Sequence, residues 1–272
     1  MDQAHTFPNL NRLSIVVGVI VLFYATIPFV QLPAEKISIN LPLVVFALDI
    51  NFGVVISLFV AFLAALGTDW LIQSHPIKHN QSLLQHGFIP ALTAWVIGVP
   101  LNSLESGPEW WIVLTLGAGL LVLVLISEYI VVDKNSSAHL PASMGLTIVS
   151  FALYLMLAIA VKASSFRLFL MAPALVFTLS LLILRALFLR TQGGIKNIYW
   201  TAAIAIFVGQ IVIGLHYLPL KPLTFGLIIV AIALGLTIFA INFEEGQQGR
   251  LLWFEPVLLM FSLLTLAIII PG

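Results

Sequence analysis

The chain has 272 residues, of which 61% are hydrophobic and 8% are charged, and its formal net charge is zero. Soluble domains are about 45–50% apolar and about 25% charged, so a soluble fold could not cover this much apolar surface. A net charge of zero argues against a nucleic-acid partner, and the lack of cysteine excludes disulfides, thiolate metal sites and cysteine nucleophiles. The composition therefore predicts a protein whose solvent is the lipid bilayer.

Nine apolar stretches are long enough to form membrane-spanning helices. A helix needs about 20 apolar residues to cross about 30 Å of hydrocarbon, and it bonds all its backbone polar groups internally, as lipid requires. We predict an all-α transmembrane bundle of about nine spans, with eight as the alternative, forming one integral membrane domain over residues 1–272. The predicted spans are residues 13–30, 43–72, 87–104, 110–132, 143–162, 166–189, 198–218, 222–243 and 251–270.

The first three stretches need separate treatment. The first follows a single basic residue, Arg12, and lacks a small-residue cleavage motif, so we expect a retained span. The second is longer than a span needs and contains Asn51, a favourable N-cap residue. We therefore expect its helix to cover residues 51–72, preceded at residues 36–48 by an interfacial segment or a short irregular entry. The third is short and contains Pro100, and without it the count falls to eight.

A shift of 116 residues aligns two similar stretches, which begin at Gly98 and Gly214 and end at Glu128 and Glu244. Residues 96–128 and their shifted counterparts share eight identities in 33 positions. Four helices separate the copies, so both copies would point the same way through the membrane, as in a parallel repeat. The alternative is two unrelated apolar hairpins with similar turns. We predict a 4+4 repeat with halves 13–132 and 143–244, followed by a terminal helix at 251–270.

The distribution of basic residues predicts the orientation. Cytoplasmic loops carry an excess of Lys and Arg, and an inner N-terminus places seven of these residues inside and four outside. We expect a prokaryotic cell-membrane protein with its N-terminus inside and its C-terminus outside. The lipid bilayer and other membrane subunits are its expected partners. The inner set is Arg12, Lys78, Lys134, Arg185, Arg190, Lys196 and Arg250, and the outer set is Lys36, Lys162, Arg167 and Lys221.

Few ionisable residues lie within the predicted spans, and each is a candidate for function. A charge at mid-depth costs about 2.5–3.5 kcal/mol on insertion scales. Asp69, Glu128, Arg185 and Glu244 lie within about two turns of helix ends on the predicted inner side. They are a candidate polar cluster in which Arg185 could pair with one of the three acids; the interpretation we favour is that each acid has its head in water at the interface and Arg185 snorkels. Gln210 is the most central strongly polar residue, and we treat it as the candidate midplane group.

Three histidines share the loop between the second and third predicted spans. His75 and His79 are four residues apart, but Pro76 lies between them and no HExxH pattern is present. We therefore expect His75, His79 and His86 to be solvated loop residues. No phosphate-binding loop or hydrolase nucleophile motif appears, so we predict no catalytic, cofactor-binding or metal-binding residues and no cofactor.

Three functions fit these observations. The first is a non-catalytic scaffold, assembly factor or subunit of a membrane complex, which the short loops and the nearly apolar midplane favour. The second is a transporter of a small molecule or lipid, which a repeat would favour. The third is an enzyme acting on a lipid-linked substrate at the inner interface, in which Asp69, Glu128, Glu244 and the loop histidines would be acid–base or metal groups. Whether the protein is an enzyme stays open, and the sequence leans against it.

Overall fold

The computed structural model describes residues 8–30, 35–41, 44–75, 83–164, 167–191 and 194–270. The chain divides into two compact units, unit 1 (Met1–His139) and unit 2 (Leu140–Gly272). The described residues form nine long helices, and eight of these are long and apolar enough to cross a membrane. The prediction of an all-α transmembrane bundle is therefore confirmed, with one β-hairpin as an addition.

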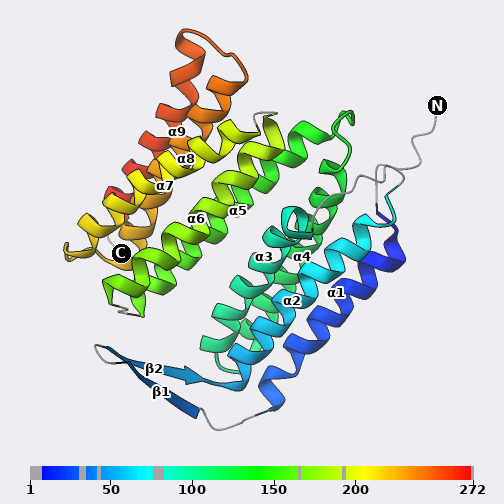
Figure 1. Ribbon diagram of the computed structural model, residues 1–272. Helices are drawn as coiled ribbons and strands as arrows, with labels where there is room; N and C mark the ends of the chain where they lie inside the picture. The colour runs from blue at the N-terminus through cyan, green and yellow to red at the C-terminus, as the bar shows by residue number, and fades with distance from the viewer. Residues whose placement is uncertain are drawn as a thin grey trace. The chain divides into compact units, whose positions relative to one another are not determined.

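Unit 1 contains four helices that lie side by side and a β-hairpin at one end of α2 (Figure 1). A short 3₁₀ turn, η1, follows α1. The elements in chain order are α1 (Leu10–Ala25), η1 (Ile27–Phe29), β1 (Glu35–Leu41), β2 (Val44–Ile50), α2 (Phe52–Ile72), α3 (Leu83–Ser103) and α4 (Pro108–Val131).

Unit 2 contains five helices joined by short connections. The turn between its third and fourth helices begins after His216 and ends at Pro222. Proline at the first helical position has no backbone N–H to leave unpaired, which explains why α8 starts there. The helices are α5 (His139–Ala163), α6 (Leu168–Arg190), α7 (Ile195–His216), α8 (Pro222–Glu244) and α9 (Arg250–Ile269).

The start of α2 confirms one prediction and corrects another. The side chain of Asn51 accepts a hydrogen bond of 2.8 Å from the backbone N–H of Val54, which caps the helix as expected. The irregular entry predicted at residues 36–48 is wrong, because this segment lies in an antiparallel hairpin with Glu35 opposite Ile50. Apolar residues at 37, 39 and 41 alternate with polar ones at 36, 38 and 40, which is a strand pattern.

Among the long helices that the structure describes, α3 is the one that is not among the eight candidate spans. It contains Pro90 and Pro100 and several polar residues, which lower its hydropathy. It packs against both α2 and α4, and Ile89, Ala94 and Ile97 along it are buried. A helix surrounded by protein can cross a bilayer with fewer apolar residues than one that faces lipid, so α3 fits as a ninth, covered span.

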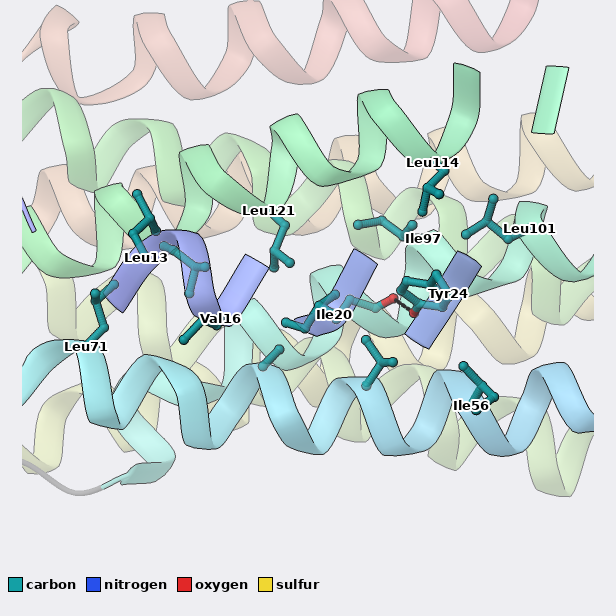
Figure 2. Packing of buried hydrophobic residues seen from close by; sticks show 14 of the residues in the cluster. Leu13, Val16, Ile20, Tyr24, Ile56, Leu71, Ile97, Leu101, Leu114 and Leu121 are labelled. Carbon is teal, nitrogen blue, oxygen red and sulfur yellow. Dashed lines mark hydrogen bonds between the residues drawn. The ribbon is translucent and has the colours of Figure 1, made fainter. Parts of the chain in front are cut away.

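The core of unit 1 follows one face of α1. Leu13, Val16, Ile20 and Tyr24 recur every three or four residues and are all buried. Figure 2 shows them in line along α1, with side chains of α2 on one side and of α4 on the other. Lipid tails are as apolar as these side chains, so close van der Waals packing holds the helices together. The partners drawn from the other helices include Ile56, Leu71, Ile97, Leu101, Leu114 and Leu121.

Polar contacts join α1, α2 and α3 within this core. The Tyr24 hydroxyl donates to the backbone carbonyl of Ala94, and the Asn102 amide donates to the Ser57 hydroxyl over 3.1 Å. Ser57 approaches α3 closely because Gly98 has no side chain. Since lipid offers no hydrogen bonds, these contacts satisfy groups that would otherwise be costly to bury.

Helix α8 is the central element of unit 2. It packs against α6, α7 and α9, and Gly226 lies against Leu155 and Ile159 of α5. Its most apolar stretch is 67% buried, compared with 11% for α9. The helix that ends the stretch from Gly214 to Glu244 is therefore the one around which unit 2 packs.

The predicted repeat is untested by these contacts and stays a prediction. The boundary between the units, after His139, falls between the predicted halves 13–132 and 143–244. In unit 1 the helices α2, α3 and α4 contact one another, and in unit 2 α6, α7 and α8 do the same. These two sets of helices are the ones that the 116-residue shift places in correspondence.

The close approach at Gly98 predicts a loss of stability in Gly98→Ala. The added Cβ would lie 2.7 Å from the Ser57 Cβ, so α2 and α3 would have to separate. We expect the free energy of unfolding in detergent to fall by about 1–3 kcal/mol, as for other overpacked cores. The control is Gly119→Ala on α4, where an added Cβ meets no atom within 4 Å. Equal stability of the two variants would contradict the prediction.

Candidate functional site

A buried acid–imidazole pair lies at one end of unit 1. Glu128, near the end of α4, has a fully buried side chain, and His86, in the first turn of α3, is 8% exposed. The His86 Nδ1 atom and the Glu128 Oε2 atom share a hydrogen bond of 3.0 Å. An ionisable pair among apolar helices is costly to bury, and it therefore marks a candidate functional site.

Helix directions explain why these two residues meet. A four-residue connection joins α3 to α4, so the two helices run antiparallel and the end of α4 returns to the start of α3. An acid near the C-terminal end of its own helix is disfavoured by the helix dipole. The contact with His86 offsets that disadvantage, because the imidazole supplies a bonding partner and lies at the N-terminal end of α3.

Aromatic packing extends the pair toward the end of α2. His75 is only 6% exposed, and its ring centroid lies 4.7 Å from that of Tyr129. The expectation of solvated loop histidines is therefore wrong for His75 and His86, while His79 lies outside the described residues. His86 is part of α3, and His75 is held against α4, so helix packing buries both rings.

One signal in the sequence could have revealed this site. The apolar run of α4 continues past Glu128 through Tyr129, Val131 and Val132, all of which are buried. Glu128 therefore lies inside the packed part of the helix and needs a partner there. The described residues hold no group of three or more His, Asp or Glu side chains arranged to bind a metal ion. A carboxylate and an imidazole can together take up and release a proton.

The acidic end of α8 in unit 2 is bonded in a related way. Glu244 accepts a hydrogen bond of 3.0 Å from the Trp200 indole N–H of α7, and the Lys196 ammonium lies 3.9 Å from its carboxylate. Glu245 accepts two hydrogen bonds, of 2.9 and 3.0 Å, from the Arg190 guanidinium of α6. These contacts connect the ends of α6, α7 and α8 and leave Glu244 mostly covered.

Asp69 and Arg185 are the other two residues of the predicted polar cluster. Asp69 accepts a hydrogen bond of 2.8 Å from Gln73 on its own helix, and Arg185 is half-buried on α6. Asp69 and Glu128 belong to unit 1, whereas Arg185 and Glu244 belong to unit 2. The four-residue cluster therefore stays a prediction, and within unit 1 Glu128 is bonded to His86.

Gln210 lies on an exposed face of α7. It is about 9 Å from the C-terminal end of the helix at 1.5 Å per residue, and so lies within the depth of the hydrocarbon. Its neighbours on the same face, Ile206 and Ile213, are 63% and 44% exposed. A polar amide thus projects from an otherwise apolar surface.

Eight candidate spans, a ninth covered helix and a buried acid–imidazole pair define a polytopic α-helical membrane protein. The chain belongs to the family described as "Protein of unknown function (DUF5656)", whose match covers residues 32–270. Neither the curated proteins nor the solved structures include a match to the chain.

The buried pair predicts a large effect of Glu128→Ala. Removing the carboxylate leaves the buried His86 imidazole without this bond, and an unsatisfied buried polar group costs about 1–3 kcal/mol. We expect the free energy of unfolding in detergent to fall by that amount. Glu109→Ala, an exposed acid in the first turn of the same helix, should change it by less than about 0.5 kcal/mol. Similar effects of both variants would show that the pair contributes nothing specific.

Proposed function

We propose that the protein is a non-catalytic subunit that assembles with other protein laterally within the membrane. The observation that carries this proposal is the exposed Gln210 amide on the apolar face of α7. In hydrocarbon an amide has no bonding partner except another protein group, and transmembrane helices associate through such groups. Gln210 therefore has a reason to be on the surface only if another helix covers it.

The charged groups support the same proposal. The carboxylates of Glu128, Glu244 and Glu245 are each bonded to a side chain within their own unit. Carboxylates that are bonded to neighbouring helices stabilise helix packing. An enzyme acting on a lipid-linked substrate would instead need acids that the substrate can reach. The enzyme is for this reason the least supported of the three functions.

The orientation with the N-terminus inside a prokaryotic cell membrane is part of this proposal.

Gln210→Leu tests the assembly function. The substitution keeps the side-chain size but removes both the donor and the acceptor, so the complex extracted in mild detergent should become smaller. The measurement is the protein mass of the complex by size exclusion with light scattering. Gln210→Asn keeps an amide and should retain more of the complex, and both variants should unfold at the wild-type temperature. An unchanged mass in Gln210→Leu would refute the proposal.

A second candidate, proton-linked transport, is favoured by the His86–Glu128 pair. Proton relays in transporters use paired acids and histidines within the membrane, and this pair is buried with a bond of 3.0 Å. Transport of this kind requires the pair to gain and lose a proton during each cycle. Infrared difference spectra between acidic and neutral solution should show a carboxyl band that is absent in Glu128→Gln. Identical spectra for the two proteins would exclude this candidate.

A further inference from the structure

We propose that the partner on α7 is a second copy of this chain, so that two α7 helices pack in parallel about a two-fold axis along the membrane normal. The proposal rests on the assembly function and names its partner. In this arrangement each Gln210 amide bonds the other. The contact is isologous, because the same surface patch serves both copies.

A heptad pattern on α7 supports a helix-to-helix contact. Six exposed residues are spaced alternately four and three apart, as in the seam of a coiled coil. The other side of the helix is buried against unit 2 through Ile204, Ala205, Val208 and Val212. The exposed residues, which we call the α7 seam, are Tyr199, Ala203, Ile206, Gln210, Ile213 and Tyr217.

Gln210 identifies a second copy as the occupant of the seam. A Gln amide carries both donors and an acceptor, so two copies of Gln210 facing each other satisfy one another. A parallel pair places equivalent heptad positions opposite each other at the same depth, where a single polar residue fixes register and oligomeric state. A second copy always supplies that group at the matching depth.

The space beside the α7 seam allows a second helix to approach closely. Gly214 lies next to Gln210 on α7, and a Cβ added there would meet no atom within 4 Å. The 116-residue shift places Ala94 and Gly98 of α3 in correspondence with Gln210 and Gly214. The Tyr24 hydroxyl of α1 bonds the Ala94 carbonyl and would lie 3.3 Å from a Cβ at Gly98. Helix α1 thus covers in unit 1 the face that stays open in unit 2.

The chain contains no cysteine. A disulfide between two copies of a single-cysteine variant can therefore form only at the introduced position. Ile206→Cys and Ile213→Cys keep Gln210 and should form disulfide-linked dimers when membranes are treated with a mild oxidant. Phe177→Cys on α6 and Ile148→Cys on α5, exposed by 68% and 66%, are the matched controls and should remain monomeric. Adding Gln210→Leu to Ile213→Cys should lower the dimer association constant in lipid vesicles about 3- to 30-fold.

The outcomes distinguish the proposal that the partner is a second copy from the proposal that the protein is an assembly subunit. Equal dimer yields at the seam and at the control positions would show random collisions and overturn the second-copy proposal. Cross-links only to a different protein would overturn it as well, while the assembly function would stand. If the seam gives no dimer and Gln210→Leu also leaves the mass of the complex unchanged, both proposals fail.

Discussion

The absence of water in the hydrocarbon decides where polar groups lie in this protein. A polar group there must be bonded by protein, since lipid offers no hydrogen bonds. Asn51 caps α2, Tyr24 bonds the α3 backbone, and Glu128 is bonded to His86. Gln210 differs from these groups because it is exposed on a helix of apolar neighbours. The need for protein to bond every polar group explains the contacts inside each unit. By the same need, the exposed Gln210 amide on α7 would require a protein partner.

Length and apolarity were sufficient to predict the helices, and residue type was sufficient to predict the Asn51 cap, because both depend on local chain properties. The hairpin at residues 35–50 was missed, although the alternation at residues 36–41 was visible, because an apolar run beside a span resembles part of that span. The pairing of His86 with Glu128 depends on which helices are neighbours and where each begins. A residue count from the span ends placed Glu128 near water, whereas packing buries it completely.

The acids at the ends of α4 and α8, which the predicted repeat would place in correspondence, have different partners. Glu128 is bonded to a ring nitrogen of His86, near the start of α3, and Glu244 to the ring nitrogen of Trp200, near the start of α7. The 116-residue shift places these two rings within two positions of each other. Imidazole can gain a proton near neutral pH, whereas indole only donates a hydrogen bond. The two acids therefore have ring partners of different hydrogen-bonding chemistry.

The prolines and polar residues of α3 have a consequence for how the chain enters the membrane. A helix that contains Pro90, Pro100 and His86 gains little by leaving the translocation channel alone. Helix α2 precedes it, is one of the strongly apolar spans, and packs closely along it. The two helices would then insert together, with α2 shielding α3 until α4 arrives. Helix α8 is the most apolar of the candidate spans, so it needs no such shielding to enter the bilayer.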